Sequence, residues 1–291
     1  MPHGLDHIVH AVRDLDAAAE FYRRAGFIVG ARNRHPWGTH NRIVQLSNCF
    51  IEILEIAEPE KIAPHGARSF SFGAFNRDFL ALREGFSMLI LNSSNAVEDN
   101  SAFEASGISN SKVFDFAREG AKPDGTPVRL AFSLAFASDP ASPYLRFAVC
   151  QHHFPQNFWD PAFQNHANGA KTVPGVAMVA DNPTDHHIFL KAFTGVRDLH
   201  SSSIGVKART GNGDVEIMEQ VAFADQFGVS PAVDGEGMTL NGLRFAVADI
   251  AQAAVLHRQN GMASRRHVGR LVVPPDLAHG ATLIFETAKV G

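Results

Sequence analysis

The sequence predicts an α+β fold in which four β-α-β-β-β modules form two paired half-barrels. The first observation is that residues 5–27 and residues 240–262 repeat one pattern without a gap. Each copy reads as a short apolar strand, an Asp at the turn, an Ala-rich helix and a closing Gly. Self-similarity on this scale indicates repeated supersecondary units. The matched positions include Leu5/Leu240, Ala11/Ala246, Val12/Val247, Asp14/Asp249, Ala18/Ala253, Arg23/Arg258 and Gly26/Gly261.

Two further copies of the pattern lie between the outer pair. Residues 173–195 match well, and residues 86–108 match more weakly, with Gly107 in the closing position. Alternating or apolar runs follow each copy, and such runs are typical of strands. These runs are residues 41–47, 49–56, 112–120, 128–136, 144–153, 202–209, 213–220, 270–274 and 281–288. Polar or Pro/Gly-bearing connectors are expected at 58–85, 155–171 and 223–238.

Strand alternation predicts which face of each sheet is free. In the first strand, Ile8, His10 and Val12 should pack under the helix, so His7, Val9 and Ala11 should face the concave side. A single curled sheet leaves an open edge, and pairing two modules covers it and encloses a cavity. We therefore expect two domains.

The first domain should span 1–157, with modules at about 4–57 and 86–154, and the second 158–291, with modules at about 172–222 and 239–289.

The composition excludes several classes of function. The net charge is −4, and a nucleic-acid surface would require a basic face. The sequence has no apolar run near the ~20 residues of a membrane helix and no signal peptide at its start. Its two cysteines fit a reducing compartment, so we expect a cytoplasmic protein. With nucleic acid and membrane excluded, the expected partner is a small molecule. The 23 phenylalanines could fill the core or line an apolar cavity.

Several segments resemble a known family. These segments are LDHIVHAV (5–12), RHPWGTHNRIVQL (34–46), FIEILEI (50–56), TPVRLAFSLAF (126–136), HANGA (166–170) and VVPPDLAHGATLIFE (272–286). With the four modules, they are similar to the glyoxalase-like domain branch of the vicinal oxygen chelate superfamily. That superfamily includes glyoxalase I, methylmalonyl-CoA epimerase and extradiol dioxygenases. The resemblance implies a divalent metal held by a His on the first strand of each module and a Glu or Gln on the last.

Carried onto this chain, the implied ligand set is incomplete. The first module offers His7 and Glu52, and the second offers Met88 and, by alignment, Gln151. The third module offers Gly175 and Glu216, and the fourth offers Gly242 with Ile284 or Phe285. The second barrel should therefore bind no catalytic metal. In the first, His7, Glu52 and Gln151 could hold Fe, Mn, Ni or Zn.

Two alternatives to a metal remain open. His7 and Glu52 could be a hydrogen-bonded polar pair, or a metal-free acid/base pair that abstracts a proton.

A second candidate patch lies in residues 32–42. An Arg fork pairs well with carboxylate or phosphate, and Trp37 and Asn41 add an aromatic wall and an amide. The alternative is a solvated strand edge blunted by charge. The predicted substrate-binding residues are Arg34, His35, Trp37, His40, Asn41, Arg42 and Gln151. Elsewhere, only one of His152 and His153 can face the cavity, and Cys49 and Cys150 should be buried inert thiols.

These observations leave two classes of function. The first is an enzyme of lyase, isomerase or related proton-transfer type, with His7 and Glu52 as catalytic residues, acting on a small oxygenated, acidic molecule. The second is a non-catalytic small-molecule binding or resistance protein. A metal-dependent dioxygenase is disfavoured, because that chemistry needs two histidines and a carboxylate. The modules could pair within the chain or across a homodimer.

Overall fold

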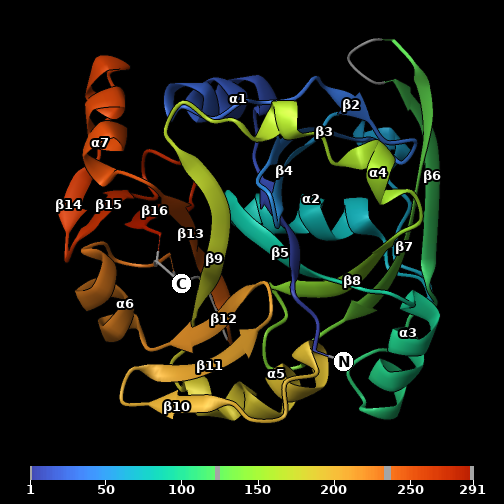
Figure 1. Ribbon diagram of the computed structural model, residues 1–291. Helices are drawn as coiled ribbons and strands as arrows, with labels where there is room; N and C mark the ends of the chain where they lie inside the picture. The colour runs from blue at the N-terminus through green and yellow to red at the C-terminus, as the bar shows by residue number, and fades with distance from the viewer. Residues whose placement is uncertain (1, 122–124, 233–236, 289–291) are drawn as a thin grey trace.

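The computed structural model describes residues 2–121, 125–232 and 237–288. The parts of the expected domains and connectors that fall on residues 1, 122–124, 233–236 and 289–291 lie outside the described residues. The order strand, helix, three strands occurs four times (Figure 1). The fold class predicted from the sequence, α+β, is confirmed.

The elements of the first half are β1 (Leu5–Ala11), α1 (Leu15–Arg24), β2 (Asn33–Arg34), β3 (Thr39–Gln45), β4 (Phe50–Ile56), η1 (Pro59–Lys61), α2 (Phe72–Leu82), β5 (Gly85–Asn92), α3 (Ala96–Ala105), β6 (Phe114–Ala121), β7 (Pro127–Ala137) and β8 (Arg146–His152). Two short helices follow, α4 (Pro155–Phe158) and η2 (Pro161–Gln164). The elements of the second half are β9 (Ala170–Val179), η3 (Pro183–His186), α5 (His187–Thr194), β10 (His200–Ser202), β11 (Gly205–Thr210), β12 (Gly213–Met218), α6 (Gln220–Phe227), β13 (Thr239–Val247), α7 (Ile250–Gln259), β14 (Arg265–His267), β15 (Arg270–Val273) and β16 (Thr282–Thr287).

The repeated Asp and Gly of the sequence pattern begin and end helices. Asp14 caps α1 by accepting hydrogen bonds from the N–H groups of residues 16 and 17, and Asp249 caps α7 in the same way. Such caps satisfy donors that the first helical turn leaves unpaired. Gly26 and Gly261 follow these helices at φ +86° and +64°, a backbone region that favours glycine. The repeat therefore encodes helix boundaries rather than a binding motif.

First strands pair with first strands within each half. β1 runs antiparallel to β5 and parallel to β4, and β5 runs parallel to β8. In the second half, β9 runs antiparallel to β13, β12 pairs with β9, and β16 pairs with β13. One residue pair, Leu240 and Phe86, joins β13 to β5, so the strands form one connected sheet.

The predicted faces of β1 agree with the packing. Ile8 and Val12 are fully buried in the main core with Ala18 of α1. Val9 lies on the other face, in a separate cluster with Leu54, Met88 and Ile90. The main core is continuous between the halves, since the rings of Phe27 and Phe245 are 5.0 Å apart.

Two helices lie where the sequence predicted only connectors or strand ends. α2 falls within the expected connector 58–85, and α6 overlaps the expected connector 223–238. Each carries Phe residues four positions apart, Phe75 and Phe79 in α2 and Phe223 and Phe227 in α6, so each presents one apolar face. In Figure 1, α2 lies in the centre of the first half, whereas α1 and α3 lie at its periphery. Within the described residues, no helix has the length and hydropathy needed to cross a membrane.

Candidate functional site

A pocket opens on the concave side of the first half. Its free volume is about 90 Å³, which suits part of a small organic molecule rather than a large cofactor. Its lining residues come from β1, β3, β4, β6, β7, β8, α2, α4 and the loop before β3. They are His7, His35, Trp37, Asn41, Ile43, Phe50, Glu52, Phe72, Phe114, Phe116, Arg118, Phe132, Leu134, Phe136, Cys150 and Phe158.

The predicted pair His7 and Glu52 lies at the polar end of this pocket. Nε2 of His7 is 4.0 Å from Oε2 of Glu52, and both side chains are more than nine-tenths buried. The Nδ2 group of Asn41 donates a 2.6 Å hydrogen bond to Oε1 of Glu52. The His7 ring stacks on Phe50, with centroids 4.3 Å apart. These contacts hold both side chains in place and leave Oε2 directed toward His7.

A β-bulge places Asp6 beside His7. The register between β1 and β5 shifts between Leu5 and His7, so Asp6 is the extra residue of the bulge. Its Oδ1 lies 2.6 Å from Nδ1 of His7. Although burial alone would raise the pKa of Asp6, His152 and His7 lower it below its usual value, so the carboxylate accepts the His7 Nδ1 proton.

When the His7 ring is neutral and carries its proton on Nδ1, the Nε2 lone pair faces Glu52. The space between them is therefore bordered by two acceptors.

The walls of the pocket are largely aromatic. Every second side chain of the paired strands β6 and β7 faces the pocket, and most of these side chains are phenylalanines. Phe114 and Phe116 of β6 face the pocket, paired with Leu134 and Phe132 of β7, and Phe136 of β7 lines the pocket as well. Phe158 of α4 closes another side, with its ring 4.8 Å from Phe50. The apolar walls exclude water from a bound molecule and favour a ligand with a flat or apolar body.

Arg118 is the arginine that lines this pocket, and it was not predicted from the sequence. It continues the alternation of Phe114 and Phe116 on β6, so the period of two in FDFAR was the available signal. Among the described residues, no hydrogen bond or ion pair is found for its guanidinium, although the Glu52 charge acts on it. Burial lowers the pKa of Arg118, and Glu52 opposes that effect. A half-buried guanidinium without a partner is suited to an anionic group of a ligand.

The predicted loop of residues 34–42 divides between two faces. His35, Trp37 and Asn41 line the pocket, and the rings of His35 and Trp37 stack with centroids 4.6 Å apart. The turn between His35 and β3 depends on Gly38, because a Cβ there would lie 2.3 Å from the carbonyl oxygen of Glu58.

The basic residues of the loop lie outside the pocket. Arg42 donates to Asp16 and to the carbonyl of Gly30, and His40 contacts Glu58. Arg34 is exposed on β2. The strand alternation explains the division, since His40 and Arg42 point to the face opposite Asn41. The loop therefore supplies aromatic and amide groups to the pocket, and its arginines form surface contacts.

The structure does not bring Gln151 together with His7 and Glu52. Its Oε1 accepts a hydrogen bond from the N–H of Ala96 at the start of α3. In the sheet, Val9 is paired with Met88 and with Glu52. Val9 and Ile90 occupy equivalent places in β1 and β5, two residues after His7 and Met88. Ile90 is paired with Ala148 as Val9 is paired with Glu52, so Ala148 is the counterpart of Glu52.

The metal site that the fold family implies does not fit the side chains present. Its four positions hold His7, Glu52, Met88 and Ala148, because His7 and Met88 occupy equivalent places in β1 and β5. Met88 is buried in an apolar cluster, and an alanine offers no ligand atom. Two of the four ligands are thus absent, and divalent metals of this class need three or more protein ligands.

The described residues of the second half fill the place that this pocket occupies in the first. Glu216 occupies the position of Glu52, paired with Ala177, but it contacts Lys207 at 3.2 Å and Arg244 at 3.9 Å. Phe223 and Phe227 of α6 fill the concave side, packed with Ile284. Among the described residues of the second half, these phenylalanines therefore occupy the space that corresponds to the pocket of the first half.

The comparisons place the chain in a family. The model of the glyoxalase-like domain family matches residues 5–194, so the chain belongs to that family. No curated protein matches it significantly. A hypothetical protein from Staphylococcus aureus is similar in structure, with a TM-score of 0.68 at 12% identity over 98% of this chain and 100% of the other.

Two similar structures are enzymes by name. A mutant of 4-hydroxymandelate synthase from Streptomyces coelicolor matches with a TM-score of 0.59 at 12% identity, over 100% of this chain and 94% of that one. A fusion of a xylose isomerase-like TIM barrel with 4-hydroxyphenylpyruvate dioxygenase matches with a TM-score of 0.55 at 11% identity, over 100% of this chain and 50% of that one. At such identities these structures support the fold of the vicinal oxygen chelate superfamily and no particular reaction.

Proposed function

We propose that the protein is an enzyme that moves a proton on a small oxygenated organic acid with an apolar body. The observation that carries the proposal is the His7–Glu52 pair at the polar end of an aromatic pocket. The two acceptor atoms are 4.0 Å apart, and both line the pocket. A carboxylate held in place beside a reacting carbon is suited to general base catalysis.

In this proposal each polar group has one task. Glu52 Oε2 takes a proton from a carbon next to the substrate carbonyl and returns it to the same or a neighbouring carbon. Asn41 holds the other carboxylate oxygen, and His7 Nε2 accepts a hydrogen bond from a substrate hydroxyl. Arg118 binds the acid group, and the phenylalanines surround the apolar body. Proton removal and return of this kind is isomerase chemistry, and a lyase would use the same abstraction to expel a leaving group from the neighbouring carbon. No step requires a metal at the family position.

A second candidate function is non-catalytic binding, and the Phe-rich walls favour it. An aromatic pocket with one cation would also sequester an organic acid without changing it. Under this alternative His7 and Glu52 only satisfy the polar end of the ligand.

The experiment that separates the two is solvent isotope exchange. Small 2-hydroxy and 2-oxo acids with aromatic or aliphatic bodies are incubated with the protein in D₂O and followed by proton NMR. Ligand binding is measured on the same compounds by calorimetry. Enzyme-dependent loss of a carbon-bound proton supports proton transfer, whereas tight binding with no exchange supports sequestration. If no compound of the panel binds and none exchanges its proton, the proposed substrate class is contradicted.

A further inference from the structure

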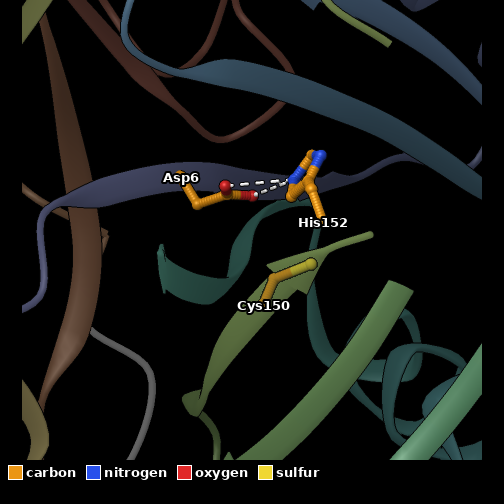
Figure 2. Close-up of side chains that lie close together, drawn as sticks. All are labelled: Asp6, Cys150 and His152. Carbon is orange, nitrogen blue, oxygen red and sulfur yellow. Dashed lines mark hydrogen bonds and ion pairs between the residues drawn. The ribbon is translucent and has the colours of Figure 1, made fainter. Parts of the chain in front are cut away.

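A second polar cluster lies behind His7, at the boundary of the pocket. It consists of Asp6 on β1 and of Cys150 and His152 on β8, the strands on either side of β5. One ligand atom from each residue lies within 4.8 Å of the other two. Figure 2 shows Asp6 and His152 pointing toward one another, with Cys150 close by. None of the three occupies a position at which the fold family holds its metal.

We propose that Asp6, Cys150 and His152 form a binding site for Zn²⁺. A carboxylate oxygen, a thiolate sulfur and an imidazole nitrogen are the ligand types that zinc takes in proteins. Tetrahedral zinc with its usual bond lengths separates such atoms by roughly 3.3–3.6 Å. The three ligand atoms lie within 4.8 Å of one another, so binding of the ion would draw them closer together. Three protein ligands leave a fourth position for water or another small ligand.

The bulge in β1 is what creates this site. Regular alternation would direct Asp6 to the face opposite His7, under the helices. The bulge instead directs it toward β8, where Oδ2 lies 3.1 Å from Nε2 of His152. Oδ1 lies 2.6 Å from Nδ1 of His7 and 3.3 Å from Nε2 of His152, so His152 contacts both carboxylate oxygens and His7 contacts one. Carboxylates that ligate metals in proteins are in turn hydrogen-bonded, and His7 supplies such a bond to Asp6.

Aromatic neighbours pack against the His152 ring, but one of its two nitrogens has no hydrogen-bond partner among the described residues. It stacks on Trp159 with centroids 6.0 Å apart and meets Phe132 edge-on at 4.9 Å. Its side chain is 92% buried, since 8% is exposed. Nδ1 of this ring has no hydrogen-bond partner. Among the described residues, Asp6 is thus the one hydrogen-bonding partner of this ring, and a ring nitrogen remains available to an ion.

An ion has a route to the cluster from outside the aromatic pocket. A separate surface pocket is lined by all three residues, together with Asn92, Ser93 and Trp159. Cys150 also lines the aromatic pocket, so the cluster forms part of the wall between the two. The proposed site can therefore load without passing the phenylalanines, and it stands independently of the proposed reaction.

The test is zinc stoichiometry and affinity on protein purified without a His tag, stripped with a chelator and reloaded. Wild type should bind one Zn²⁺ per chain. Cys150→Ser and His152→Gln should bind at least about ten-fold more weakly, and His7→Ala, which removes only the support of Asp6, about 10- to 100-fold more weakly. Cobalt-loaded wild type should show a thiolate-to-cobalt charge-transfer band that Cys150→Ser lacks.

Two matched controls make the result specific. Cys49→Ser changes the other buried thiol, which lies in the main core, and should bind zinc like wild type. Glu52→Gln should also bind like wild type, and loss of zinc in this variant would place the ion at the His7–Glu52 pair instead. Wild type that binds no zinc, or folded Cys150→Ser and His152→Gln that bind it normally, would overturn the proposal. Thermal melts of each variant show whether it is folded.

Discussion

Asp6 Oδ1 lies 2.6 Å from Nδ1 of His7, and this bond fixes what the other end of the His7 ring can do. When the ring is neutral with its proton on Nδ1, His7 directs a lone pair from Nε2 toward Glu52. No described residue places a hydrogen-bond donor between Nε2 of His7 and Oε2 of Glu52, so that space is suited to a hydroxyl or acidic C–H of a ligand. The relationship joins three residues of two strands into one polar unit at the end of an aromatic pocket.

Replacing Arg118 should weaken the binding of acids selectively. Arg118→Gln removes the pocket cation, so an organic acid should bind about 10- to 100-fold more weakly, as expected for loss of a charged hydrogen bond of about 1.5–3 kcal/mol. The corresponding amide should bind equally well to both proteins. Calorimetric titration of each matched pair measures the difference.

Arg42→Gln is the control for this prediction, because Arg42 contacts Asp16 and Gly30 outside the pocket. Equal weakening of acid and amide by Arg118→Gln would indicate a structural role for Arg118.

Acidification should destabilise the protein through His10. Burial lowers the pKa of His10 to about 4, although the hydrogen bond from its ring to the carbonyl of His279 opposes the shift. Between about pH 6.5 and pH 4 the unfolded chain binds a proton at this residue that the folded chain does not. Stability is therefore retained above pH 6.5 and falls as the pH drops, by up to about 3 kcal/mol.

The measurement is urea unfolding of wild type and His10→Gln at several pH values. The stability difference between the two proteins should shrink or reverse on going from pH 7 to pH 4.5. A difference that does not change with pH would show that His10 has an ordinary pKa.

Gly38→Ala should destabilise the protein and disturb the pocket together. Gly38 has φ +91°, and a Cβ would lie 2.3 Å from the Glu58 carbonyl oxygen. The expected cost is about 1–3 kcal/mol, with weaker ligand binding because His35 and Trp37 shift. Gly107→Ala shares the positive φ but has open space around it, so it should cost less and leave binding intact. Chemical denaturation of the two variants tests the comparison.

The two halves should respond differently to loss of a phenylalanine. Phe223 is fully buried in the concave side of the second half, so Phe223→Ala should destabilise by about 3–5 kcal/mol. Phe132 lines the open pocket and is only partly buried, so Phe132→Ala should cost less stability and more ligand affinity. Similar stability losses in both variants would contradict the view that the concave side is open in the first half and filled by α6 in the second.

The sequence predicted much of the fold because repeats and alternation are local signals. Asp14 and Asp249 marked helix starts, and the spacing in β1 assigned Ile8 and Val9 to opposite faces. The position of Asp6 beside His7 was not predicted, since a bulge depends on the neighbouring strand and has no local sequence signature. α2 and α6 were missed because their apolar residues lie within segments that otherwise read as polar connectors.

The candidate site was predicted only in part. His7 and Glu52 lie together, but Arg118 and Cys150 come from strands more than 60 residues away along the chain. Gln151 was assigned by counting along the last strand of the second module, and the register shows that Ala148 occupies that place. Which side chains converge depended on strand pairing, which the sequence did not reveal.

The most direct measurement of the central claim is the deuterium exchange rate of a bound acid with Glu52→Gln and Glu216→Gln. The two glutamates hold equivalent positions in their modules, but only Glu52 faces the open pocket. We expect Glu52→Gln to lower the exchange rate at least about 100-fold while the protein still binds the acid, and Glu216→Gln to leave the rate unchanged. Exchange that persists in folded Glu52→Gln would contradict the assignment of Glu52 as the base.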